Sequence, residues 1–172
     1  MISRLFMLGF VLAVINACSL GGVSQGQDAR ADSVLSQTVS VENDTLNLIL
    51  SHYLDVKDAL VASEVEQAAL AALDLAESLE SIEGCQTTAQ LAEQINSQQD
   101  IGQQRADFAI VSQDLIAMFQ HVQVRSGALY VTHCPMYNDQ QGADWISASK
   151  EIENPYYGDK MLSCGKVVQT LD

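Results

Sequence analysis

The chain has 172 residues and a formal net charge of −14, from 8 basic and 22 acidic side chains. This length predicts one domain that can bury a sizeable core. The acidic balance argues against nucleic acid as a partner and against direct adsorption to anionic lipid, because both need a basic face. A solvated surface is the simplest explanation of the excess negative charge.

The first 17 residues have the order of a bacterial lipoprotein signal peptide. Arg4 supplies a positive start, residues 5–15 are apolar but too few to span a bilayer, and Cys18 follows shortly after. Cleavage before Cys18 would leave that cysteine as the lipidated N-terminal residue. We therefore expect export and anchoring in the cell envelope, and Ser19 favours the outer membrane, facing the periplasm. An ordinary secretory peptide would predict the same compartment without the anchor.

Residues 18–42 predict a flexible tether, because Gly, Ser, Gln, Asp and Val alternate there without a sustained period. Residues 43–172 then form the folded domain. Four amphipathic helices are predicted in it. They run from Asn43 or Asp44 to about Val61, from a capping box at residues 63–66 to near Gly84, from Thr87 or Thr88 through Ile95, and from Asp100 towards Gly127.

Helices with such short connections pack most simply as an antiparallel four-helix bundle, so the predicted fold class is mainly α. After Gly127 the period changes, and residues 128–172 predict a small irregular or β cap. Residues 128–132 and 167–171 have strand character and would pair, with one helical turn expected at residues 145–150.

The cap contains five side chains that suit a soft metal ion. They are His133, Cys134, Met136, Met161 and Cys164. If the two segments meet, two thiols and two thioethers converge with an imidazole at the edge, which is the donor set that favours Cu(I) or Ag(I). Zinc fits less well, because it rarely binds methionine and would lack a fourth ligand. A blue-copper centre would need a second histidine, from His52 or His121.

A disulfide between Cys134 and Cys164 is the alternative explanation of the same residues. It would close a loop of about 30 residues and stabilise the cap by roughly 3–4 kcal/mol on the chain-entropy model. Without Cys18, three cysteines remain in an oxidising compartment, so one must be free, liganded or paired elsewhere. Cys85 is the one we expect to be unpaired. The sequence offers no supported nucleophile, and we do not expect an enzyme.

Several short motifs carry a resemblance to a bacterial family known as domain of unknown function 3347. They are Tyr53–Val61, Gln104-Arg105 with Phe108, Cys134-Pro-Met136, Trp145-Ile-Ser147, Ile152–Gly158 and Met161–Gly165, so that the resemblance covers about residues 44–172. Members of that family are exported or lipid-anchored, and similar domains are attached to periplasmic adaptor subunits of copper and silver efflux systems. The resemblance therefore implies a metal-handling context for Cys134, Met136, Met161 and Cys164.

Together these patterns give two hypotheses. The first is a periplasm-facing lipoprotein that binds Cu(I) or Ag(I), for buffering or for delivery to an efflux adaptor. The second is a non-catalytic module, closed by the Cys134–Cys164 disulfide, whose aromatic cap docks to another envelope protein and holds no metal.

Overall fold

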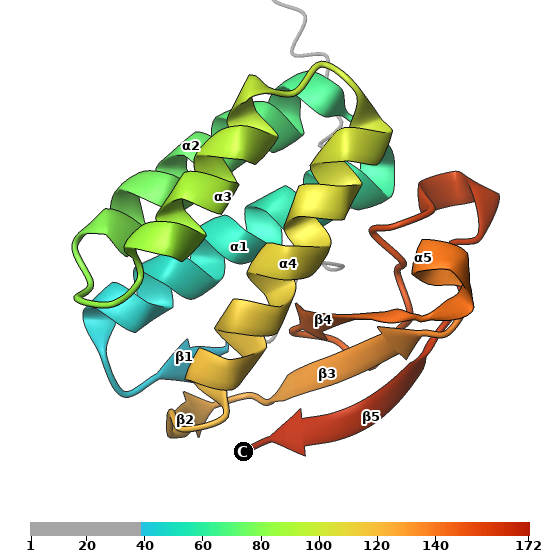
Figure 1. Ribbon diagram of the computed structural model, residues 1–172. Helices are drawn as coiled ribbons and strands as arrows, with labels where there is room; N and C mark the ends of the chain where they lie inside the picture. The colour runs from blue at the N-terminus through green and yellow to red at the C-terminus, as the bar shows by residue number, and fades with distance from the viewer. Residues whose placement is uncertain (1–38) are drawn as a thin grey trace, which may run out of the picture. The chain divides into compact units, whose positions relative to one another are not determined.

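The computed structural model describes residues 39–172 (Figure 1). The predicted signal peptide, Cys18 and nearly all of the predicted tether lie outside the described residues. The described elements are, in chain order, β1 (Ser40–Val41), α1 (Asp44–Ala62), α2 (Val65–Glu80), α3 (Gln86–Ser97), α4 (Ile101–Phe119), β2 (Val124–Ser126), β3 (Leu129–Cys134), α5 (Tyr137–Gln140), β4 (Ala143–Ser147), η1 (Gly158–Lys160) and β5 (Lys166–Leu171). Within residues 39–172, no helix is long and apolar enough to cross a membrane.

Four long helices make the described part of the protein mainly helical, and two of them begin at the predicted caps. Asn43 accepts hydrogen bonds from the backbone N–H groups of Thr45 and Leu46 at the start of α1. Asp100 does the same for Gln103 in α4. In both cases a side-chain oxygen satisfies a donor that the first helical turn leaves unpaired. Contacts run mainly between consecutive helices, α1 with α2, α2 with α3 and α3 with α4.

The predicted capping box at the start of the second helix is wrong. Ser63 instead ends α1 with a left-handed backbone (φ 61°), and its N–H bonds the carbonyls of Ala59 and Leu60. Only two residues join the helices, so Ser63 cannot also take the extended backbone that an N-cap needs. Glu64 precedes α2 without a capping side-chain bond.

The third helix also starts earlier than predicted. It follows Cys85, so Thr88 lies inside the helix, where its hydroxyl donates to Asp114 of α4 at 2.8 Å. The second helix ends at Glu80, ahead of Gly84. The fourth ends at Phe119 rather than near Gly127, because residues 124–126 form β2 and pair with β1.

The cap contains a three-stranded antiparallel sheet in the order β4-β3-β5, beside α4 in Figure 1. The predicted pairing of the first and last cap strands is confirmed, with Leu129 opposite Leu171. The helical turn expected at residues 145–150 is wrong, because Trp145 lies in β4 opposite Thr132. Strand β3 also extends to Cys134, two residues beyond the predicted end at residue 132, so His133 and Cys134 belong to a strand.

Buried aromatic rings and hydroxyl groups join the sheet to the helices. Tyr53 of α1 and Phe108 of α4 stack with ring centroids 5.1 Å apart. The Tyr53 hydroxyl accepts a hydrogen bond from the Ile146 N–H of β4 at 3.0 Å. The Tyr156 hydroxyl donates to the Asp144 carbonyl of the same strand. These two hydroxyls bond backbone groups of β4, which is an edge strand of the sheet. They thereby protect this edge from pairing with a further strand.

The buried side chain of Arg105 connects the C-terminal end of α1 to the cap. Arg105 of α4 is 7% exposed. Its Nε donates to the Pro155 carbonyl at 2.8 Å, and one Nη donates to the Leu60 carbonyl and the Ser63 hydroxyl, each at 2.9 Å. Burial lowers the pKa of Arg105, yet the guanidinium stays charged because its ordinary pKa lies far above neutral. The partners are all neutral oxygens at the end of α1 and in the cap.

We expect Arg105→Lys to destabilise the protein by about 2–3 kcal/mol, because an ammonium group cannot reach acceptors in two directions as the planar guanidinium does. Urea unfolding measures the change. Arg125→Lys, at an exposed position in β2, is the matched control and should be nearly neutral. Equal stability of the two variants would contradict this role for Arg105.

Candidate functional site

Two cysteines from distant parts of the cap meet in the structure. Cys134 ends β3 and is fully buried, whereas Cys164 lies just before β5 and is partly exposed. Both are free thiols, and their sulfur atoms lie 3.6 Å apart. The pair is therefore in direct contact without a covalent bond. One thiol is open to solvent and the other is held in the core.

Strand geometry separates His133 from this pair. Neighbouring residues of a strand point to opposite faces, so the His133 side chain leaves the sheet on the other side from Cys134. Its Nδ1 lies 2.7 Å from a carboxylate oxygen of Asp144, the residue opposite it in β4. The sequence analysis expected this imidazole at the edge of the converging sulfur donors, whereas strand β3 directs it away from Cys134.

The two methionines lie towards solvent. Met136 is 46% exposed and Met161 is 37% exposed. Each is close in sequence to one of the thiols, and the Met161 carbonyl accepts a bond from the Cys164 N–H at 3.0 Å. Of the five predicted donors, the two thiols are the pair for which the described structure gives a direct side-chain contact.

Elsewhere the described residues offer no larger cluster of metal donors. Among residues 39–172, no group of three or more His, Cys, Asp or Glu side chains is arranged to hold a metal ion. Cys85, like Cys134 and Cys164, is a free thiol, and it directly precedes α3. Burial and the nearby Asp114 raise its pKa.

The environment of the pair keeps Cys164 protonated. Burial first, and then the neighbouring Cys134 thiol, raise the pKa of Cys164 above its ordinary value. A raised pKa lowers the thiolate fraction at neutral pH and so makes Cys164 a weaker nucleophile. Oxidation or metal binding must therefore displace a proton from this sulfur.

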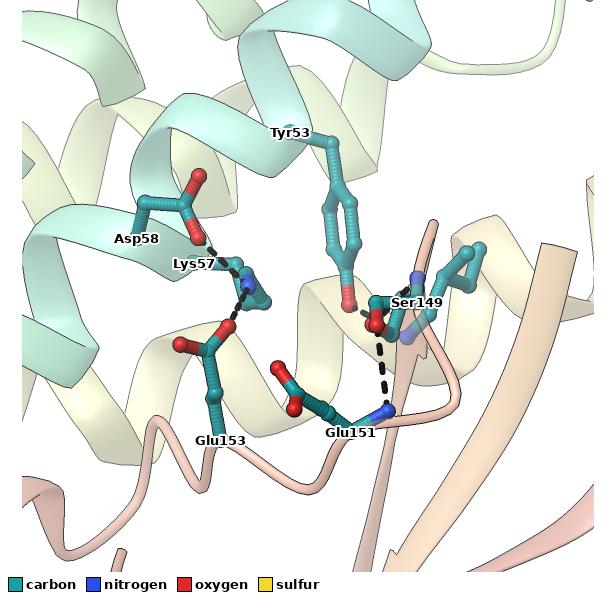
Figure 2. Close-up of polar contacts among 8 residues, drawn as sticks. Tyr53, Lys57, Asp58, Ser149, Glu151 and Glu153 are labelled. Atoms are coloured by element: carbon teal, nitrogen blue, oxygen red, sulfur yellow. Dashed lines mark hydrogen bonds and ion pairs between the residues drawn. The ribbon is translucent and has the colours of Figure 1, made fainter. Parts of the chain in front are cut away.

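One segment of the cap, residues 153–158, lies between the helices and the thiols. Lys57 of α1 is buried and forms ion pairs with Asp58 and with Glu153, at 3.5 Å to the latter (Figure 2). Pro155 receives the hydrogen bond from Arg105 described above. The segment is thus fixed to α1 and to α4, at successive positions along its backbone.

Gly158 ends this segment at a position that tolerates no side chain. Its φ is 55°, and a Cβ there would lie 2.7 Å from the Ser63 hydroxyl and 2.8 Å from an Arg105 nitrogen. Only glycine combines the left-handed backbone with this close approach. The segment therefore packs directly onto the end of α1.

Asn154 and Tyr157 extend from this segment to the two thiol-bearing chains. The fully buried Asn154 donates from Nδ2 to the Cys164 carbonyl at 2.7 Å. The Tyr157 hydroxyl donates to the Met136 carbonyl at 2.9 Å, two residues beyond Cys134. Sequence reasoning assigned neither role.

Aromatic rings cover the space around the segment. Tyr156 stacks on Tyr137 at 4.4 Å between centroids and meets Trp145 edge-on at 5.8 Å. Tyr157 meets Tyr137 edge-on at 6.0 Å. Tyr156 also lies against Phe108 of α4, so these rings join the cap to that helix.

The fold and the site define a mainly helical protein with a small antiparallel sheet that carries a pair of contacting thiols. Residues 49–127 match the model of a family described as Protein of unknown function (DUF3347), so this part of the chain is similar to that family. The match ends before Cys134, so it includes α2, α3 and α4 but none of the five predicted metal donors. Neither the curated proteins nor the solved structures that were searched gave a match.

The difference in burial gives a direct test of the thiol geometry. We expect iodoacetamide to modify Cys164 at least about tenfold faster than Cys134 in the folded, reduced protein, because a fully buried thiol reacts only after local opening. Peptide mass spectrometry at short reaction times measures both rates. Denatured protein is the control, in which the two rates should converge. Equal rates in the folded protein would contradict the arrangement.

Proposed function

We propose that this protein is a lipid-anchored, periplasm-facing binding protein that holds one Cu(I) or Ag(I) ion between Cys134 and Cys164. The observation that carries the proposal is the 3.6 Å contact between the two free sulfur atoms. Two thiolates at short range are the donors that a soft, closed-shell ion prefers. A small outward movement of one sulfur would admit the ion.

The unequal burial of the thiols supports a binding role with ion exchange. Cys164 can receive an incoming ion at the surface, and Cys134 then completes the site from the core. Met136, Met161 and His133 are proposed as further donors. The exposed methionines could approach from the solvent side, whereas His133 would have to leave Asp144. The thioethers are therefore the stronger candidates for a third ligand.

The rest of the proposal concerns location and partner. Lipidation at Cys18 would anchor the protein in the envelope, in the outer membrane, and the predicted tether would let the helical domain reach an efflux adaptor or another envelope protein. We propose buffering of the ion or its delivery to such a partner, and no catalysis. For the helical part we propose the antiparallel four-helix bundle as the packing class.

The same sulfur contact also favours a second candidate, a disulfide-closed interaction module. Closing the pair needs a shift from 3.6 Å to the usual disulfide length of about 2.05 Å. In an oxidising compartment this bond would exclude the metal ion and leave the aromatic cap as a docking surface. Protein isolated from the periplasm with both thiols alkylatable would count against this candidate.

A silver titration tests the metal site, because Ag(I) has the ligand preferences of Cu(I) without its redox chemistry. We expect one tightly bound ion per reduced chain, and loss of binding in both Cys134→Ser and Cys164→Ser. Met161→Leu should weaken binding by about tenfold if the thioether is a ligand. Met118→Leu in α4 is the matched control. Unchanged affinity in the cysteine variants would overturn the site, and unchanged affinity in Met161→Leu would remove that residue from it.

Binding should strengthen as pH rises. The raised pKa keeps the Cys164 thiol protonated near neutral pH, while the bound ion requires the thiolate. Between pH 6 and 8 we therefore expect the Ag(I) affinity to rise by about tenfold per pH unit for each proton displaced. Competition titrations at several pH values measure the slope, and Cys164→Ser should lower it. A flat profile would mean that the ion is held by neutral donors instead.

A further inference from the structure

The separation of the two thiols depends on contacts that lie outside the pair. Cys134 is placed by β3, whose pairing with β4 sets Cys134 opposite Ala143. Cys164 has no such support, because it lies in the irregular stretch between η1 and β5. Something other than sheet pairing must hold Cys164 against Cys134.

Asn154 supplies that support with its backbone and its side chain. Its N–H donates to the Leu162 carbonyl at 2.8 Å, and its Nδ2 donates to the Cys164 carbonyl at 2.7 Å. Its remaining polar atoms are also paired, Oδ1 with the Tyr156 N–H and the carbonyl with the Gly158 N–H. With no exposed surface, the side chain has no alternative partner in water. Residues 162–164 are thereby attached to a fixed point.

Tyr157 makes the matching connection on the other side. Its hydroxyl donates to the Met136 carbonyl, directly after the Cys134-Pro135 pair. The two thiol-bearing stretches are thus attached to residues three apart in one short segment.

We propose that Asn154 and Tyr157 are the positioning residues of the thiol pair and together set the distance between Cys134 and Cys164. The helices hold the segment that carries them, through Lys57 to Glu153 and through Arg105 to Pro155. The pair is therefore held to a separation that the helical part of the molecule determines. This arrangement raises the effective concentration of one sulfur at the other, which favours any reaction that uses both.

Two readouts in the full-length chain test this proposal. The first is Ag(I) affinity, which rests on the proposed function. The second is the equilibrium with oxidised glutathione, in which the two protein thiols give two electrons and two protons to form the disulfide and two molecules of reduced glutathione. The second readout needs no metal, so it remains informative if the proposed function fails.

We expect Tyr157→Phe, which removes one hydroxyl and keeps the ring, to lower both equilibrium constants by about threefold to tenfold. Asn154→Ala should lower them by about tenfold or more, which for the two-electron couple corresponds to about 30 mV. In the double variant, the fold-decrease of each equilibrium constant should be smaller than the product of the two single decreases. Breaking either bond already lets the two thiols move apart.

Matched variants separate positioning from general loss of stability. Asn96→Ala removes a similar side-chain bond to a backbone carbonyl, at 2.8 Å to Ala69, in another part of the helical region. Tyr130→Phe removes a tyrosine hydroxyl elsewhere in β3. Neither should change the glutathione equilibrium, even if Asn96→Ala unfolds more easily in urea.

Each outcome has a distinct meaning. Unchanged glutathione equilibrium in folded Tyr157→Phe and Asn154→Ala, or equal shifts in the control variants, would overturn the positioning proposal. If Asn154→Ala does not fold, Tyr157→Phe decides the question alone. A shifted glutathione equilibrium in a protein that binds no Ag(I) would support positioning and reject the metal function.

Discussion

The buried guanidinium of Arg105 is the interaction on which the arrangement of the rest depends. A charge removed from water must be surrounded by acceptors, and here they are oxygens of Leu60, Ser63 and Pro155. These acceptors belong to the end of α1 and to the cap, so Arg105 is satisfied only when both have reached their final positions. Folding of the helices and formation of the thiol site are thereby coupled by one side chain.

The long helices were largely predictable because local signals and tertiary structure agree there. Asn43 and Asp100 cap α1 and α4, and apolar residues recur at helical spacing behind them. The predicted boundary between α1 and α2 was wrong, because Ser63 can either end the first helix or cap the second. Serine is a common N-cap residue, yet the two-residue connection and the bond from Arg105 place Ser63 at the end of α1. A local motif cannot reveal a contact with a residue 42 positions away.

The chemistry of the site was predictable only in part. The pairing of Cys134 with Cys164 followed from residue types, and the structure does bring the sulfur atoms together. The remaining members of the donor set, His133, Met136 and Met161, stay a prediction, because no side-chain contact of theirs with either thiol is among the described contacts. Strand β3 continues through Cys134 and directs His133 to the other face. Asn154 was missed for a different reason, since its importance lies in burial and in a partner that sequence spacing does not identify.

The two thiols differ in how much structure must move when they separate. Displacing Cys134 would disturb the last pair of β3 with β4, beside buried Trp145. Displacing Cys164 would break the bond from Asn154 to its carbonyl and the turn bond from its N–H to the Met161 carbonyl. The backbone at Gly165 packs closely against Trp145, since a Cβ there would lie 2.9 Å from the ring. The chain next to Cys164 therefore has little room to move inward. For the proposed metal function, entry or release of an ion would require outward movement of Cys164, and the bond from Asn154 would oppose that movement.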